Sequence, residues 1–213
     1  MAAENQGEIG GEPGDETVVA AALGLIAAKG WRATTLPDIA AAAGTSLARL
    51  LPRFPGKSSV LTAFQRGLDR AGLASPAEAD ASVRDRLFEL FMRRFDALQK
   101  HRAAVQRLAR ELPADPLSAL CLAPGACGSL RAIAELAGVD TAGPLGLIRI
   151  KGLAAVYACA FRAWLGDDSS DMARTMKALD KALDRAEMLA RSWPGRRRTA
   201  SGGSEPVAAP APS

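Results

Sequence analysis

Apolar residues recur every three to four positions along most of this 213-residue chain, which is the period of an amphipathic helix. The first run covers about Asp15 to Lys29, and Gly30 is placed to end it. Alanine and leucine are prominent and no strand pattern is evident, so the sequence predicts an all-α protein of packed helices. Further helices are expected from Ser58 onward, over Ser82 to His101, over Ala103 to Leu112, over Pro144 to Leu165, and after Ser170 as far as Trp193.

Two short helices are predicted between the first and second long ones. Thr35 can cap a helix that runs through Ala43, because its hydroxyl can accept a hydrogen bond from a free N–H of the first turn. Gly44 supplies a left-handed turn, and Thr45 or Ser46 caps the next helix. Two short capped helices around a glycine have the outline of a DNA-reading helix-turn-helix.

A proline lies inside the second of these short helices. Pro52 has no N–H for the Ala48 carbonyl, and its ring disfavours helical geometry at the preceding residue. We therefore expect Leu51 to leave helical geometry and the helix to be shortened to Ser46–Leu50.

Two later segments leave structural questions open. Pro124 and Gly125 interrupt the stretch from Asp115 to Val139, which predicts two short helices there. The last helix carries apolar residues that alternate by four and three, a heptad pattern that suits either packing within one chain or a subunit interface. These residues are Met172, Met176, Leu179, Leu183, Ala186 and Ala190.

The helices group into two parts. A three-helix module with the helix-turn-helix is expected within residues 15–72, and a larger antiparallel helical bundle within 82–194. Residues 1–14 and 195–213 have the composition of a disordered leader and tail. The tail contains Arg196, Arg197 and Arg198, which are either solvated or in contact with nucleic acid or acidic lipid.

Basic residues are concentrated in the N-terminal part. The net charge of the chain is +4, but residues 17–72 hold seven basic side chains and two acidic ones. This asymmetry is typical of a surface that contacts phosphates, and a solvated basic surface would look the same.

Residues with catalytic chemistry are sparse. His101 is the single histidine, so a catalytic triad or a histidine-rich metal site is not expected, and we expect it to cap the end of its helix. Cys121, Cys127 and Cys159 lack metal-ligand spacing and are expected to be reduced and buried. The serines and aspartates of 167–171 are expected to cap the last helix, with Ser169 or Ser170 as the cap.

The lack of catalytic and metal-binding patterns indicates the class of protein. We expect no catalytic residue, no metal and no cofactor, and therefore not an enzyme. The first residues do not form a signal peptide, and the apolar run 152–161 is too short to span a membrane, so we expect a cytoplasmic location.

The first quarter of the chain resembles the DNA-binding domain of TetR-type repressors. That resemblance implies that 15–72 is a DNA-binding domain, that 82–194 binds a ligand and forms the dimer, and that the second short helix enters the major groove. It depends on Ala28, Lys29, Gly30, Trp31, Thr34, Thr35, Asp38, Ile39, Ala40, Ala43, Gly44, Ser46, Leu50, Phe54 and Lys57.

The resemblance also implies individual DNA contacts. Thr35 and Lys57 would hold phosphates, Ser46, Leu47 and Arg49 would face bases, and Arg53 would add a further contact. Two positions depart from the family: Leu51 replaces a tyrosine that binds phosphate, and Pro52 replaces a polar residue.

The second half resembles another protein with a TetR-like fold, the lipid-binding accessory protein of ubiquinone biosynthesis. This resemblance implies a lipid site in the bundle and a helix-turn-helix without a DNA role. An aromatic motif of that family is replaced here by Gly143 and Pro144. The matching residues are 92–101, 137–140, 153–157 and 164–171, with Thr175, Leu179 and Asp180.

A set of apolar residues in the bundle could enclose a hydrophobic ligand or simply form the core. We interpret the chain as a TetR-like regulator, a repressor relieved by such a ligand. Its expected partners are operator DNA, a hydrophobic small molecule or isoprenoid lipid, and a second copy bound through the last two helices. The alternatives are a lipid-binding accessory protein and a scaffold with neither activity. The candidate ligand-binding residues are Phe88, Phe91, Phe95, Cys121, Tyr157, Phe161 and Trp164.

Overall fold

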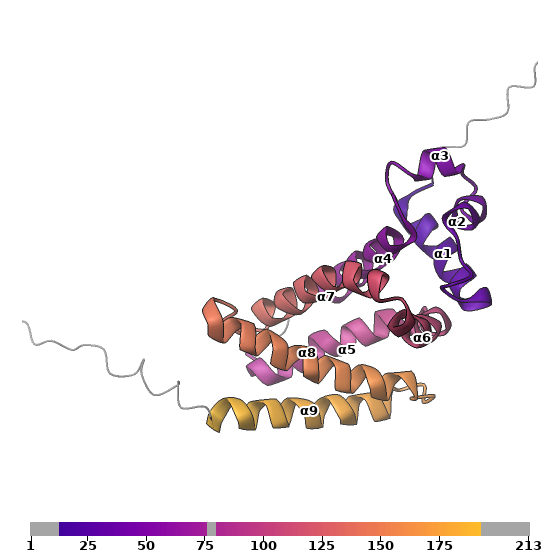
Figure 1. Ribbon diagram of the computed structural model, residues 1–213. Helices are drawn as coiled ribbons and strands as arrows, with labels where there is room; N and C mark the ends of the chain where they lie inside the picture. The colour runs from indigo at the N-terminus through magenta and orange to yellow at the C-terminus, as the bar shows by residue number, and fades with distance from the viewer. Residues whose placement is uncertain (1–12, 76–79, 193–213) are drawn as a thin grey trace, which may run out of the picture.

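The computed structural model describes residues 13–75 and 80–192, and within these ranges the chain is helical without strands (Figure 1). This confirms the all-α fold. The elements are α1 Asp15–Lys29, α2 Leu36–Ala42, α3 Leu47–Leu50, α4 Lys57–Gly72, α5 Val83–Gln99, α6 Arg102–Glu111, a 3-10 turn η1 Leu112–Ala114, α7 Pro116–Leu136, α8 Gly143–Leu165 and α9 Ala173–Ser192.

The helices enclose two apolar cores. Helices α1, α2 and α3 and one side of α4 form the small N-terminal core, with Val18, Ile39 and Phe54 almost fully buried. The larger core lies among α4 to α9 and also takes in Leu23 and Ile26 of α1 and Trp31. Helices α8 and α9 lie side by side along the bundle (Figure 1). This is the expected helix-turn-helix module followed by a helical bundle. The expected tail with Arg196–Arg198, the end of the last helix at Trp193 and most of the leader lie outside the described residues.

Helix α7 corrects one expectation. It runs without a break through Pro124 and Gly125, so the prediction of two short helices is wrong. A proline removes one helical hydrogen bond, but the packing of α7 on α4 stabilises the helix enough to offset this loss. A Cβ at Gly125 would lie 2.8 Å from the Gln65 Oε1 atom of α4, so the glycine permits this close approach.

Part of the heptad pattern of the last helix packs within the chain, whereas Ala190 is exposed. Met172, Leu179 and Leu183 are at most 5% exposed and belong to the large core. The end of α8 is joined to α9 by Asp167, whose buried carboxylate accepts hydrogen bonds from the backbone N–H and hydroxyl of Thr175. The Ser169 hydroxyl accepts a bond from the Ala173 N–H, as expected for a cap.

Two other expectations are wrong. His101 does not cap a helix with its side chain; its ring packs edge-to-face on Phe64, 5.4 Å between centroids. Burial lowers the pKa of His101, which disfavours the cationic form that a helix C-terminus would attract. The three cysteines, Cys121, Cys127 and Cys159, are exposed rather than buried.

Candidate nucleic-acid interface

Thr35 opens α2 with a complete capping box. Its hydroxyl accepts a hydrogen bond from the Asp38 N–H, and the Asp38 carboxylate accepts one from the Thr35 N–H at 2.9 Å. The Lys29 ammonium lies 2.7 Å from the same carboxylate. Lys29 and Thr35 together hold the pKa of the Asp38 carboxyl well below its usual range. The start of α2 is therefore fixed by local bonds that the sequence pattern predicts.

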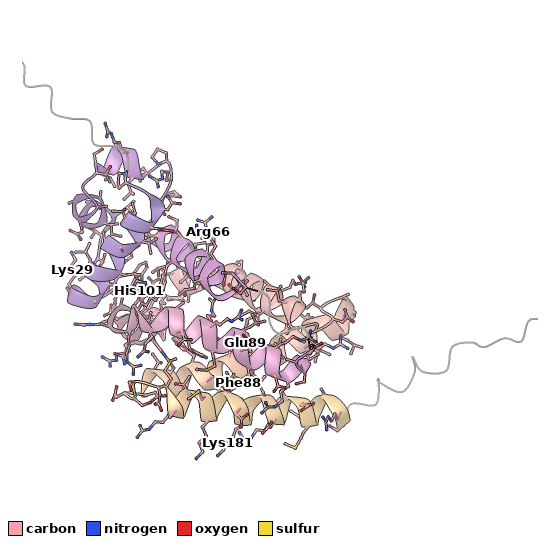
Figure 2. The ribbon with its side chains drawn as sticks, turned by 180° about the vertical axis from the view of Figure 1, so that it is seen from behind. Lys29, Arg66, Phe88, Glu89, His101 and Lys181 are labelled. Carbon is pink, nitrogen blue, oxygen red and sulfur yellow. The ribbon has the colours of Figure 1, made fainter. Side chains whose placement is uncertain are left out.

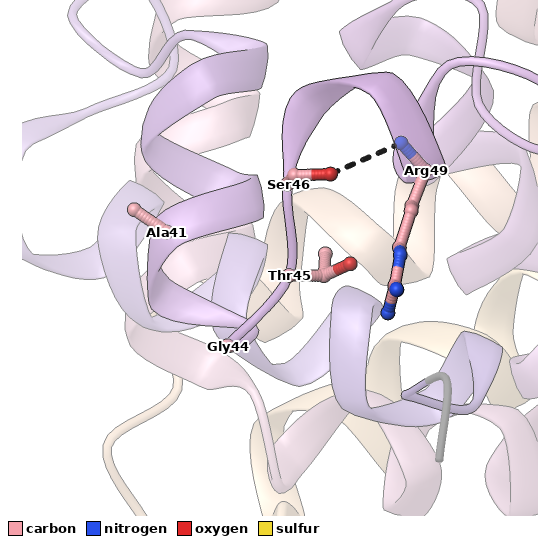
Figure 3. A pocket seen from close by; sticks show the side chains of 5 residues that line it. All are labelled: Ala41, Gly44, Thr45, Ser46 and Arg49. Atoms are coloured by element: carbon pink, nitrogen blue, oxygen red, sulfur yellow. Dashed lines mark hydrogen bonds between the residues drawn. The ribbon is translucent and has the colours of Figure 1, made fainter. Parts of the chain in front are cut away.

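Helix α3 starts at an exposed surface. Gly44 has φ +69°, the left-handed turn expected between the two helices. The Ser46 hydroxyl then accepts a hydrogen bond from the Arg49 N–H (Figure 3). Arg49 is exposed and Leu47 is half-buried. With Ala41 and Thr45, residues 44, 46 and 49 line an open hollow of about 470 Å³. The first turn of α3 thus presents the cationic side chain of Arg49 outward, while Leu47 packs in part against the small core.

Pro52 affects the backbone less than expected. The second short helix does span only Leu47–Leu50, but Leu51 keeps right-handed helical angles, φ −54° and ψ −42°. The expectation that Leu51 leaves helical geometry is therefore wrong. The Phe54 N–H bonds to the Leu50 carbonyl at 2.8 Å and closes the end of the motif. Because Phe54 is buried in the small core, tertiary packing holds the turn around the proline.

Two residues expected to contact DNA make bonds within the chain instead. The Lys57 ammonium donates to the carbonyls of Trp31 and Thr34, at 3.1 and 3.4 Å, and lies 4.3 Å from the Trp31 ring centroid. The Arg53 guanidinium binds the Pro13 carbonyl and the Asp15 carboxylate. The phosphate contacts of Lys57 and Arg53 remain predictions. To make them, both side chains would have to leave their present partners within the chain.

The positive charge of the module is also partly balanced. Asp15 pairs with Arg53, and Glu16 lies 3.7 Å from Arg70, so two acidic residues just before the basic segment offset it. Within residues 13–75 and 80–192, Arg32, Arg49 and Arg66 make no ion pair, and Arg66 points outward from α4 (Figure 2). Of these three, only Arg49 lies in the helix-turn-helix itself.

A polar contact joins the module to the larger domain. The Trp31 indole N–H donates to the Asp115 carboxylate at 3.0 Å, and the Arg32 N–H donates to Glu111 at 2.9 Å. Bonds from Ser118 and Trp31 lower the pKa of Asp115 to about 2. We call this the Trp31 contact. Sequence reasoning missed it, because its partners are about 80 residues apart and carry no shared motif.

The candidate ligand residues divide into three groups. An aromatic cluster of five rings has centroids 5.3–6.4 Å apart, and Phe91, Phe95 and Trp164 in it are fully buried. Phe88 is half-buried against the same core, whereas Cys121 is exposed on α7. The structure thus brings together Phe91, Phe95, Tyr157, Phe161 and Trp164.

Comparison with known proteins agrees with this architecture. Residues 18–64 match the family described as "Bacterial regulatory proteins, tetR family". No curated protein matches the sequence. A TetR transcriptional regulator from Nitrosomonas europaea is similar in structure, with 24% identity and a TM-score of 0.65, over 82% of this chain and 98% of that one.

Two further solved structures have the same fold. A TetR transcriptional regulator from Rhodococcus sp. RHA1 has 19% identity and a TM-score of 0.60, over 80% of this chain and 93% of that one. The repressor FadR of Thermus thermophilus, in complex with lauroyl-CoA, has 20% identity and a TM-score of 0.50, over 94% and 100%.

The match falls on the segment that carries the capped α2–α3 pair, and it agrees with the expectation of a regulator rather than an enzyme. The resemblance of the second half to the ubiquinone accessory protein remains a prediction. The described part of the chain therefore has the fold of the TetR transcriptional regulators, and its residues 18–64 match the tetR family of bacterial regulatory proteins.

Proposed function

We propose that this protein is a cytoplasmic DNA-binding repressor of transcription. The observation that carries the proposal is the exposed start of α3, where Ser46 caps the helix and Arg49 projects without an ion pair among the described residues. Helix-turn-helix proteins contact base edges with the N-terminal residues of the second helix. The four-residue α3 keeps that turn, so the early end at Pro52 removes only the part that follows it.

The regulating ligand in this proposal is a hydrophobic molecule bound in the larger domain, an acyl chain or an isoprenoid lipid. The aromatic cluster supplies apolar side chains that an acyl chain or isoprenoid could contact, and a structural relative was solved with lauroyl-CoA. Such a ligand would favour a bundle conformation in which paired modules no longer match adjacent major grooves.

A second copy of the chain is the third partner. Most of the exposed large apolar side chains of the described residues lie on α7 and α8, and they include Leu117, Leu120, Leu147 and Ile148, between 49% and 72% exposed. Met188 and Leu189 near the end of α9 are exposed as well. Both helices are long and apolar enough to cross a membrane, a test that buried helices of soluble proteins also pass. Since Leu179 and Leu183 of the heptad pattern are buried within the chain, we assign the dimer contact to α8 and its neighbour α7 rather than to α8 and α9 as expected from the sequence.

Ile148→Glu is expected to dissociate the dimer, because it places a charge in an apolar interface. Light scattering after size-exclusion chromatography would then report the mass of one chain. Lys181→Glu on the outer side of α9 is the control and should retain the mass of two chains (Figure 2). A wild-type protein with the mass of one chain would contradict the assignment.

Arg49→Ala is expected to weaken specific DNA binding about 5–150-fold, the effect of losing one good base contact of 1–3 kcal/mol. Gel retention of fragments from the protein's own upstream region, over a salt series, measures this. Arg131→Ala on α7 is the charge-matched control, since Arg131 is also exposed but lies outside the module. It should bind DNA as the wild type does.

The same preparation tests the alternative. If the wild type retains no fragment at any salt concentration and co-purifies with an isoprenoid lipid, the repressor proposal is wrong and the lipid-binding accessory protein is favoured. If the protein binds neither DNA nor lipid, the third interpretation, a scaffold with neither activity, is favoured.

A further inference from the structure

Helix α4 contributes to both cores of the molecule, as does helix α1, whose Leu23 and Ile26 lie in the large one. Val60 and Ala63 pack in the small core, while Leu61, Phe64 and Leu68 pack in the large one. The helix leads from the α1–α3 module into the bundle, where it lies against α7 (Figure 1). The direction of α4 within the bundle, together with the packing of α1 on α6, therefore sets where the module lies.

Polar contacts hold α4 near both of its ends. At its start, Lys57 binds the carbonyls of Trp31 and Thr34, which belong to the module itself. Near its other end, Asp69 binds the Arg94 guanidinium of α5, and it accepts a hydrogen bond from the Ser129 hydroxyl of α7 at 2.6 Å. We call Asp69, Arg94 and Ser129 the Asp69 joint.

The Asp69 joint is unlike the other ion pairs of the described residues. Its arginine side chain is only 9% exposed, whereas the remaining pairs involve side chains exposed by 18% or more. A buried ion pair adds little net stability compared with apolar residues of similar size, because both charges lose water. Its bonds are directional, however, so it fixes one register between the helices that meet there.

The position of the joint also relates it to the candidate ligand site. Arg94 lies on α5 between Phe91 and Phe95, and its guanidinium carbon is 5.8 Å from the ring centroid of Tyr157 on α8. One arginine thus touches both the aromatic cluster and the carboxylate that anchors α4.

We propose that Asp69, Arg94 and Ser129 are positioning residues for DNA binding: they set the direction of α4, and with it the separation of the two reading helices in the dimer. The inference rests on the proposed function. The three residues do not contact DNA themselves, and they act only through α4. They therefore determine which spacing of two half-sites is bound, while the α3 residues determine the sequence of each half-site.

In vitro selection from random duplex DNA separates these two properties, because enriched sequences report both the half-site and the spacing. The variant is Asp69→Asn, which weakens the bond to Arg94 and retains an oxygen for Ser129. The control is Asp184→Asn, which also affects an ion pair between an α5 arginine and another helix, but one on α9. Arg84 keeps Asp180 as a partner in that control.

We expect the wild type and Asp184→Asn to enrich paired half-sites with one preferred spacing. Asp69→Asn should enrich the same half-site with a shifted or broadened spacing, and bind the wild-type duplex about tenfold more weakly. Its affinity for a single half-site should stay within about twofold of the wild type, because Arg49 is unchanged.

An unchanged spacing in Asp69→Asn would overturn the inference, and so would an equal loss of paired and single half-site binding, which indicates a purely structural role. A wild type that enriches no sequence would refute the proposed function and the inference with it. Should Asp69→Asn fail to fold, the double variant Asp69→Leu with Arg94→Met removes the pair without leaving a buried charge, and the same outcomes apply.

Discussion

Gly30→Ala is expected to lower the free energy of unfolding by about 2–4 kcal/mol, a large effect for one methyl group. Gly30 has φ +87° and ψ 166°, a conformation that is almost restricted to glycine. A Cβ at this position would also lie 2.4 Å from the Glu111 Oε1 atom. Backbone strain and a steric conflict therefore act together.

The steric conflict reaches the contact between the two domains. Glu111 accepts the hydrogen bond from the Arg32 N–H, and moving its carboxylate away from Gly30 breaks that bond. The neighbouring bond between Trp31 and Asp115 then holds the Trp31 contact alone. We expect the variant to bind operator DNA more weakly as well, because the module is less firmly oriented.

Chemical denaturation of matched variants measures the stability effect. Gly24→Ala is the control, since Gly24 lies within α1 and a Cβ there would meet nothing within 4 Å. It should raise the free energy of unfolding by about 0.5–1 kcal/mol, because alanine is the better helix former. Equal and small effects of both substitutions would show that Gly30 is not strained and that Glu111 adjusts without cost.

The parts of the fold that could be predicted from the sequence are those with local causes. The bounds of α1 follow from its apolar period and from Gly30. The starts of α2 and α3 follow from Thr35 and Ser46, whose hydroxyls bond within the same turn. Each of these signals lies within four residues of the feature that it fixes.

The parts that could not be predicted depend on contacts between distant segments. Leu51 stays helical although Pro52 follows, because Phe54 is anchored in the small core. Helix α7 continues through Pro124, because it packs on α4. Local rules predict how much a proline destabilises a helix. Whether the helix forms nevertheless depends on the stabilisation that it gains by packing against the surrounding core.

The candidate site also combines features with local causes and features that depend on distant contacts. The family resemblance predicts that Arg49 reads bases, and Arg49 is exposed at the start of α3, where that role can be tested. The same resemblance predicts that Lys57 binds a phosphate, but its ammonium lies against the Trp31 ring. Its partner could not be found from spacing, because a lysine 26 residues away from a tryptophan carries no periodic signal.

Phe95→Ala is expected to have the largest effect of all, a loss of about 3–5 kcal/mol in the free energy of unfolding. Phe95 is fully buried, and its ring stacks on Tyr157 at 5.3 Å and lies 6.4 Å from Trp164. Removing the ring leaves a cavity among packed aromatic side chains. Phe88→Ala is the control, since Phe88 lies half-buried at the edge of the same core and should cost less than half as much.

The same pair of variants distinguishes a ligand site from ordinary core. If the aromatic cluster binds an acyl chain, lauroyl-CoA at about 100 times its dissociation constant should stabilise the wild type by about 2.7 kcal/mol and Phe95→Ala by much less. If the cluster is core alone, the wild type gains nothing, and Phe95→Ala gains stability from benzene, because a dry apolar cavity accepts such a molecule. Stabilisation of both proteins by lauroyl-CoA to the same extent would place the acyl chain elsewhere in the bundle, and the role of Phe95 in ligand binding would be excluded.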